Sequence, residues 1–276
     1  MILPTDFQFS QASLQDYVDC PRRFQLRYVE RVAWPAPEAE PALENERYLQ
    51  QGAAFHRLIH QHLLGFPPER LSSTVTDDNL QHWWRNYLES GLSNLPDVRY
   101  PEVLLSAPVS DYRLVAKYDL VAIAPGRRVV IVDWKTSRKR SQRKWLTQRL
   151  QTRVYPYLLV RAGAHLNDGQ ALEPEHVEMV YWFASFPNNP ERFAYDAAQY
   201  HADEVRLISL IEEIKNLRDH EWSLTTQERH CRYCPYRSLC QRGVRAGPFD
   251  EIEETPEPDD DFDISIDFEQ IAEIEY

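Results

Sequence analysis

The chain has 276 residues, of which 43 % are hydrophobic and 12 % aromatic, and this is enough to build a substantial core in one large domain or two small ones. No apolar run approaches the roughly 20 residues that a membrane-spanning helix needs, so we expect no membrane partner. The net charge of −12 is concentrated at one end: residues 250–276 contain 13 of the 43 acidic residues and no Lys or Arg. The remaining 249 residues hold 30 acidic and 31 basic side chains, so the charge does not exclude a nucleic-acid partner.

The first predicted elements are helical. Residues 10–30 have helically spaced apolar positions interrupted by Pro21, which predicts two short helices that meet at Cys20. The segment WPAPEAEP at 34–41 predicts a linker. Further helices are predicted over 45–64 and 80–90.

The pattern then changes to that of strands. Strands are predicted over 102–109, 112–124 and 128–134, with a turn at Pro125-Gly126. The third strand contains VVIV and is apolar enough to be buried on both faces. Helical spacing returns over 142–162, a strand is predicted over 177–184, and a long helix over 197–219. This order predicts a mixed α/β fold, with helices before the sheet and a cysteine-rich segment after it.

The acidic segment 250–276 begins as a run broken by prolines and ends with acids that alternate with Ile and Phe. We expect its first half to be disordered. The segment is either a solvated tail or a docking element, in which the apolar residues bind a partner or cover a basic groove of the same protein. The docking residues would be Phe262, Ile264, Ile266, Phe268 and Ile271.

Two carboxylates and a lysine form the first candidate site. Asp133 and Lys135 lie two residues apart at the end of a buried strand, so they point to the same side of the sheet. A hairpin through the Pro-Gly turn would bring Asp119 beside Asp133. Two adjacent carboxylates favour a hard cation such as Mg²⁺ or Mn²⁺, which activates water and stabilises charge on a phosphate. The alternative is a surface Asp-Lys ion pair.

A basic segment follows this site directly. It is the densest in the chain and predicts phosphate binding, unless it is only a solvated helix face. Gln151 and Tyr155 lie four residues apart, on one helix face, although Tyr155 could also belong to the core. Trp134 and Trp145 offer planar surfaces for unstacked bases. The basic residues are Arg138, Lys139, Arg140, Arg143, Lys144, Arg149 and Arg153.

His56 is a further candidate ligand, with His60 one turn later. The sequence HRLIH lacks the Glu of a zinc-protease helix, so that enzyme class is unsupported. A single helical histidine can also be purely structural.

The four cysteines are unevenly spaced: Cys20 stands near one end, and Cys231, Cys234 and Cys240 lie together near the other. Zinc sites usually draw on local pairs of ligands, whereas iron–sulfur clusters tolerate uneven spacing. The pattern favours a cluster over zinc or unrelated buried thiols. Disulfides are the least expected, because the first residues lack the basic and apolar regions of a secretory signal. We therefore expect a cytoplasmic protein.

Taken together, these residues resemble the RecB-like exonuclease family of PD-(D/E)xK nucleases, in particular the members with an iron–sulfur cluster, including CRISPR-associated ones. The resemblance covers about residues 8–242 and includes the opening segment FSQASLQDYVDCPRRFQLRYV. It rests on Gly52-x-x-x-His56, Asp119, Asp133-Trp134-Lys135, Gln151-x-x-x-Tyr155 and the cysteines. One departure is Ala116, where the family commonly has Gly, and Glu102 is a plausible supporting acid.

The resemblance implies a restriction-endonuclease-like core at about 45–220, within a single nuclease domain over 1–249. Segments 10–30 and 228–242 would form an iron–sulfur clasp, in which Cys20, Cys231, Cys234 and Cys240 hold a structural 4Fe-4S cluster. The metal ligands would be His56, Asp119, Asp133 and the carbonyl of Trp134. Lys135 would be the catalytic lysine, and Gln151 and Tyr155 would contact the scissile strand.

The expected function is a Mg²⁺- or Mn²⁺-dependent DNA exonuclease that acts on single-stranded ends or flaps, in DNA repair or recombination or in CRISPR adaptation. A helicase or a CRISPR-adaptation protein is the expected partner. One alternative is a non-catalytic scaffold that binds DNA or a helicase, although such a scaffold has no need of an intact Asp119, Asp133 and Lys135. Another is an endonuclease of the same fold.

Overall fold

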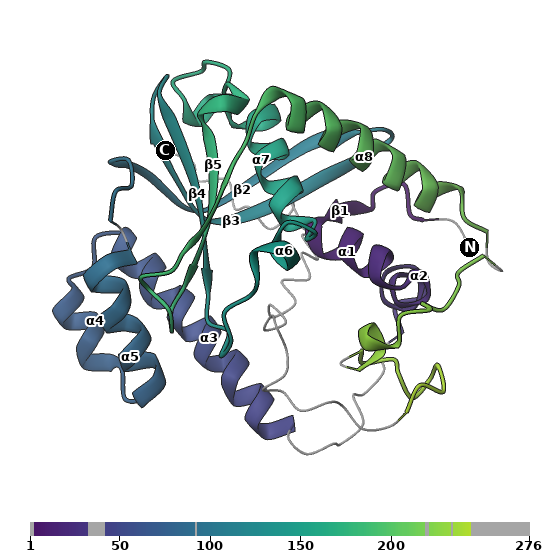
Figure 1. Ribbon diagram of the computed structural model, residues 1–276, viewed down its shortest axis with the longest axis horizontal. Coiled ribbons are helices and arrows are strands. Elements are labelled where there is room, and N and C mark those ends of the chain that lie inside the picture. Colours follow the sequence, from purple (N-terminus) through teal and green to yellow (C-terminus); the bar gives the residue numbers. More distant parts are fainter. Residues whose placement is uncertain (1–2, 33–41, 92, 219–220, 233, 244–276) are drawn as a thin grey trace, which may run out of the picture.

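A computed structural model describes residues 3–32, 42–91, 93–218, 221–232 and 234–243. The linker predicted at 34–41 and the acidic segment 250–276 lie outside the described residues. The centre of the fold is a mixed six-stranded sheet with helices on both faces (Figure 1). Its strands are β1 (Gln8–Ser10), β2 (Val98–Val109), β3 (Tyr112–Ala124), β4 (Arg128–Lys135), β5 (Val177–Phe183) and β6 (Glu191–Ala194).

Two apolar clusters lie on opposite faces of this sheet. On one face, Val129 and Ile131 pack with residues from α1 (Gln11–Asp19), α7 (Gln151–Ala162) and α8 (Ala197–Asn216). On the other, Val130 and Val132 pack with α3 (Ala42–Leu63), α4 (Pro68–Thr74) and α5 (Asp78–Asn86). Strand β4 is therefore buried on both faces, as its VVIV sequence predicted, and the mixed α/β fold is confirmed.

Most of the predicted elements are present. The helical segment 10–30 is interrupted at Cys20, between α1 and α2 (Pro21–Phe24), and continues as a π-helical turn (Gln25–Val29). Hydrogen bonds between the side chains and backbones of Ser10 and Ser13 cap the start of α1. The sequence pattern did not predict β1, α4 or β6, because segments of three to seven residues are too short to show a periodicity. None of the helices in the described ranges is long and apolar enough to cross a membrane.

The helix predicted over 142–162 is broken in the structure into α6 (Arg143–Leu146) and α7. In a continuous helix, the backbone N–H of Leu150 would donate to the carbonyl of Leu146. It donates instead to Oε1 of Gln15 in α1, at 3.0 Å. The prediction of unbroken helix was wrong at 147–150, and the cause is a contact with a residue 135 positions away in sequence.

The edge of β3 that faces β4 is paired in two separate pieces. Residues 120–124 of β3 pair antiparallel with β4, and this pairing ends at Leu120 opposite Val132. Residues 113–115 of β3 pair parallel with β1, and this pairing ends at Val115 opposite Ser10. The residues from 116 to 119 have no strand partner on this edge, so the sheet forks beside Asp119. This fork leaves room for side chains to meet between strands.

Candidate active site

Three buried polar side chains form a connected group on the α7 side of the sheet. Nζ of Lys135 lies 3.0 Å from Oδ2 of Asp133, and both side chains are less than 10 % exposed. Gln151, the first residue of α7, donates from Nε2 to Oδ1 of Asp133 at 2.7 Å and accepts from Lys135 at 3.2 Å. Asp133 and Lys135 thus point to the same face, as their spacing predicted, and Gln151 links them. We call these candidate catalytic residues the catalytic trio below.

Asp119 and His56 form a second polar group at the fork. Nδ1 of His56, on α3, lies 3.2 Å from Oδ1 of Asp119. Oδ2 of Asp119 accepts a hydrogen bond from the backbone N–H of Trp134 at 2.8 Å. Since β3 and β4 stop pairing at Val132, this carboxylate takes the place of a strand partner for Trp134. The hairpin brings Asp119 next to β4, where Lys135, the ion-pair partner of Asp133, also acts on the Asp119 carboxylate.

The chemistry of these donors fits a divalent cation, because Mn²⁺ and Mg²⁺ accept carboxylate oxygen and Mn²⁺ also accepts imidazole. Within the described part of the chain, however, no group of three or more His, Cys, Asp or Glu is arranged to hold a metal ion. Asp133 contacts Lys135 and Gln151, and Asp119 contacts His56.

The environment of Asp119 favours its ionised form. Burial raises the pKa of this carboxyl, but the charge of His56, the hydrogen bonds from His56 and Trp134 and the charge of Lys135 together hold the pKa below its ordinary value of 3.8. Asp119 is therefore ionised at neutral pH, which is the state that a metal ligand requires.

This lowered pKa predicts a pH dependence of stability. A carboxyl whose pKa is lower in the folded state stabilises the fold fully above its unfolded pKa, and this contribution is lost as the pH falls through the folded value. We expect the difference in unfolding free energy between wild type and Asp119→Asn to shrink as the pH falls below about 4. Urea unfolding at a series of pH values measures it, with the exposed Asp78→Asn as a control for net charge. A difference that is independent of pH contradicts the prediction.

Most of the predicted DNA-binding residues already have partners within the protein. Arg140 and Arg143 form ion pairs with Glu191 of β6, and Arg153 pairs with the buried Asp203 of α8 at 2.7 Å. Arg138 lies over the ring of Tyr48 and Arg149 over that of Trp145, each at 4.8 Å. Lys139 and Lys144 are exposed. Part of the basic segment therefore stabilises the fold through contacts within the protein. The sequence analysis missed this because it did not predict strand β6, which contains Glu191.

The aromatic predictions have mixed outcomes. Trp134 is 2 % exposed and packs in the core against α3 and α5, so the prediction that it offers a surface to bases is wrong. Trp145 is half-buried beneath Arg149. Tyr155 is 6 % exposed, and its ring packs against Tyr118 at 4.8 Å. Gln151 is 2 % exposed, and its hydrogen bonds to Asp133 and Lys135 lie inside the protein. Glu102 forms an ion pair with Lys117 at 2.7 Å.

The structure adds one residue that sequence analysis did not select, Thr136, and shows what Gly52 of the Gly52-x-x-x-His56 motif contacts. Thr136, directly after Lys135, is buried, and its carbonyl accepts a hydrogen bond from the hydroxyl of Tyr48 on α3. Gly52, one turn along α3, comes so close that a Cβ there would lie 3.1 Å from Oγ1 of Thr136. The sequence contained one indication of this contact: Tyr48, Gly52 and His56 are spaced four residues apart, which places all three on one face of the helix.

The two ends of the described chain meet where α1 and α2 lie close to the segment that follows α8 (Figure 1). Cys20 lies near enough to Cys231, Cys234 and Cys240 to influence each of them electrostatically. The backbone N–H of Arg22 donates to the carbonyl of Ser223 at 3.1 Å, and the Tyr236 hydroxyl donates to the carbonyl of Val32 at 3.2 Å. Cys20 and Cys234 are buried, Cys231 and Cys240 half-buried, and all four are free thiols.

The thiols influence one another electrostatically. Burial raises the pKa of Cys234 to about 11. Burial, followed by the charge of Cys20, also raises the pKa values of Cys231 and Cys240. Like the acidic residues, these thiols are not arranged as a metal-binding group among the described residues. The structure therefore brings the cysteines into one region without defining a cluster site.

Comparison with known proteins gives three results. No curated protein sequence produced a match. Among solved structures, the protein SSO0001 is 16 % identical with a TM-score of 0.41, over 84 % of this chain and 85 % of that one. A candidate exonuclease from Eubacterium rectale is 12 % identical with a TM-score of 0.42, over 79 % of this chain and 89 % of that one. The sequence profile described as the PD-(D/E)XK nuclease superfamily matches residues 8–241. Because this match spans the sheet, the catalytic trio and Asp119, the chain belongs to the PD-(D/E)XK nuclease superfamily.

Proposed function

We propose that the protein is a metal-dependent exonuclease that hydrolyses phosphodiester bonds at single-stranded DNA ends or flaps. The observation that carries this proposal is the catalytic trio beside Asp119, at a fork of the central sheet. A buried lysine held between a carboxylate and an amide is costly for a protein to maintain without a use for it. The superfamily match makes a nuclease the natural use.

In this proposal, His56, Asp119, Asp133 and the carbonyl of Trp134 hold Mg²⁺ or Mn²⁺. A bound ion of this kind lowers the pKa of water and stabilises charge on the scissile phosphate. Lys135 supplies a positive charge close to that phosphate. Gln151 positions Lys135 and Asp133 through its two hydrogen bonds. The contact of Gln151 and Tyr155 with the scissile strand, and the phosphate contacts of the basic segment, are parts of the same proposal.

The clasp is a second part of the proposal. We propose that the four cysteines bind a structural 4Fe-4S cluster that joins segments 10–30 and 228–242 of a single nuclease domain. The electrostatic influence of Cys20 on Cys231 and Cys240, and the 3.6 Å contact between Nδ1 of His230 and Oδ1 of Asp19, support it. Protein purified without oxygen should show the visible absorption of an iron–sulfur cluster and contain iron and sulfide. A colourless protein that contains stoichiometric zinc contradicts it.

The proposed pathway is DNA repair or recombination, or CRISPR adaptation, with a helicase or an adaptation protein as the partner in the cytoplasm. The competing function is a scaffold that binds DNA or a helicase and does not cut. Among the described residues, the complete trio of Asp133, Lys135 and Gln151 favours the enzyme over the scaffold. Nicking of circular single-stranded DNA would instead identify an endonuclease.

The deciding experiment uses linear single-stranded DNA labelled at either end, incubated with the anaerobically purified full chain. We expect the substrate to disappear with Mg²⁺ or Mn²⁺ and to persist with EDTA, and the order in which the labels are released gives the polarity. A protein that binds this DNA but leaves it intact under every metal condition overturns the nuclease proposal in favour of the scaffold.

A small substitution on α3 should affect cleavage more than stability. Gly52→Ala removes a helical glycine, a gain of about 1 kcal/mol, but places a methyl group 3.1 Å from Oγ1 of Thr136. These effects oppose each other, so we expect little change in the free energy of unfolding. Because displacement of Thr136 also moves Lys135, we expect cleavage to fall by about 10- to 100-fold.

The matched test of this prediction is the double variant Gly52→Ala/Thr136→Ala, which removes the Oγ1 atom that the new methyl group meets. Recovery of cleavage relative to Gly52→Ala, compared with the effect of Thr136→Ala alone, measures the coupling of the two positions. Equal activity in wild type and Gly52→Ala shows that the contact has no consequence for Lys135.

A further inference from the structure

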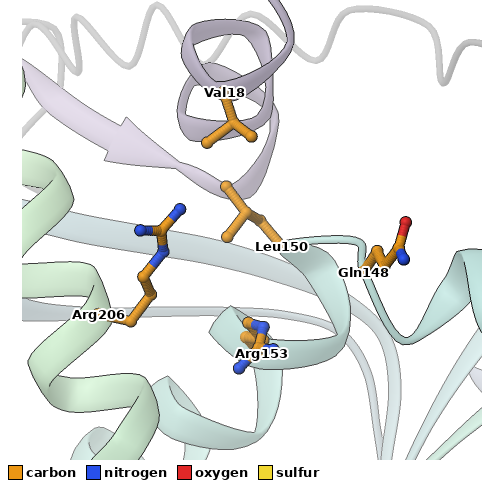
Figure 2. A pocket seen from close by; sticks show the side chains of 5 residues that line it. All are labelled: Val18, Gln148, Leu150, Arg153 and Arg206. Carbon is orange, nitrogen blue, oxygen red and sulfur yellow. The ribbon is translucent and has the colours of Figure 1, made fainter.

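A pocket with a volume of about 390 Å³ opens between α1, the start of α7 and α8, and its lining is Val18, Gln148, Leu150, Arg153 and Arg206. Figure 2 shows Val18 and Leu150 close together at its centre, with Arg206 reaching toward them from α8 and Arg153 on the α7 side. The pocket therefore combines an apolar patch, two guanidinium groups and one amide. Apart from Arg153, which belongs to the basic segment, none of its lining residues belongs to a site described above.

The pocket is separate from the catalytic trio, although α7 contributes to both. Residues two positions apart on an α-helix point about 200° away from each other. Gln151 turns to Asp133 and Lys135, whereas Arg153 turns to Asp203 of α8. A strand bound at the catalytic trio would have to pass around the start of α7 to reach the pocket.

The charges of the pocket favour an anion. Asp203 is fully buried and lies 2.7 Å from the guanidinium of Arg153. This carboxylate partly neutralises the charge of Arg153 and also fixes the position of its guanidinium. Arg206 is exposed, and no acidic residue in the described ranges forms an ion pair with it. One pre-positioned and one available guanidinium suit a phosphate group, which accepts several charge-assisted hydrogen bonds.

The apolar part of the pocket indicates more than inorganic phosphate. Val18 is 44 % exposed, on a helix whose neighbouring residues are mostly buried, and Leu150 lies beside it. A nucleotide presents a phosphate together with the flat face of a base or sugar, and Gln148 can donate to or accept from such a group.

We infer that this pocket binds one nucleotide unit of single-stranded DNA through its phosphate, away from the cleavage site. The inference rests on the proposed function, because it assumes a DNA substrate. The same chemistry is present in a free nucleotide, so the source of the phosphate is decided by the test. A contact of this kind would hold the strand while the catalytic trio acts on a different phosphate.

The test measures the binding of labelled oligo-dT and of dTMP to the full chain in EDTA, so that no cleavage is needed. We expect Arg206→Gln to weaken oligo-dT binding about tenfold and to reduce the slope of log affinity against log salt by about 0.7, the value for one lost phosphate contact on a single strand. Val18→Glu, which places a carboxylate near the two arginines on an exposed helix position, should weaken binding as well. Arg70→Gln, an exposed arginine on α4, is the matched control and should change neither quantity.

The outcomes separate this inference from the proposed function. If wild type and all variants bind oligo-dT equally, the pocket assignment is overturned and the nuclease proposal stands. If the wild type binds neither oligo-dT nor dTMP, the DNA substrate itself is overturned, and the pocket with it. Arg206-dependent binding of dTMP alone assigns the pocket to a free nucleotide. If deletion of 250–276 raises DNA affinity only when Arg206 is present, the acidic segment competes with DNA for the pocket, and the inference is supported.

Discussion

Lys135→Ala is expected to lower the rate of single-stranded DNA cleavage by about two to three orders of magnitude, the usual effect of removing one group that stabilises transition-state charge. The side chain lies at the end of β4, bound to Asp133 at 3.0 Å and to Gln151 at 3.2 Å. Its ammonium is therefore fixed in position before any substrate binds, and a solvent ion cannot replace it with the same geometry. Initial rates with end-labelled DNA and saturating Mg²⁺ or Mn²⁺ measure the effect.

The control for this prediction is Lys215→Ala, which removes the same charge from a partly exposed site near the end of α8. Thermal unfolding of both variants separates lost chemistry from lost folding. DNA binding in EDTA should survive in Lys135→Ala, because the defect is in the reaction. A folded Lys135→Ala protein that cleaves at more than about a tenth of the wild-type rate removes Lys135 from the mechanism.

Asp133→Ala is expected to destabilise the fold by about 3–5 kcal/mol, since it leaves the buried ammonium of Lys135 without its carboxylate. Both side chains are less than 10 % exposed. Gln151 and the ring of Tyr181, which also contact the ammonium, are neutral and cannot replace the lost charge. Burial of an uncompensated charge is costly in any interior. Urea unfolding followed by tryptophan fluorescence gives the free energy, and the slope with urea checks that the unfolded state is unchanged.

The matched variant for this prediction is Asp133→Ala/Lys135→Met, in which the ammonium is removed together with its partner. We expect this double variant to be more stable than Asp133→Ala, because the replacement of both partners of a buried ion pair by apolar groups is often neutral. Both variants should be inactive. If the single and double variants unfold at the same urea concentration, the ion pair does not determine the stability of this region.

The sequence predicted the long elements well, since their periodicities extend over many residues. The three consecutive strands, the helix around His56 and the long helix near the end of the described chain all appear within a few residues of the predicted bounds. The short elements β1, α4 and β6 were missed. Strand β1 exists because it pairs with β3, and β6 because it pairs with β5, so tertiary contacts define them.

The candidate site was predicted in part. The shared side of Asp133 and Lys135 followed from the two-residue period of a strand, and the four-residue spacing of Gln151 and Tyr155 from the helix. The burial of each side chain and the partners that it binds did not follow from the spacing. Gln151 and Tyr155 are buried, and three arginines of the basic segment pair with Glu191 or Asp203. Such pairings depend on residues some fifty positions away, which no local pattern records.

The sequence by itself determined which elements form and which residue types stand together along the chain, because hydrophobic periodicity and strand or helix spacing are local properties. Only the tertiary structure decided where the sheet forks beside Asp119 and which acid faces Lys135. It also decided that α7 begins at Gln151, because Gln15 of α1 accepts the hydrogen bond from the backbone of Leu150. It alone showed a pocket between α1, α7 and α8. The physical reason is that these features arise from hydrogen bonds, ion pairs and packing between segments far apart in sequence, whose energies depend on geometry that the fold creates.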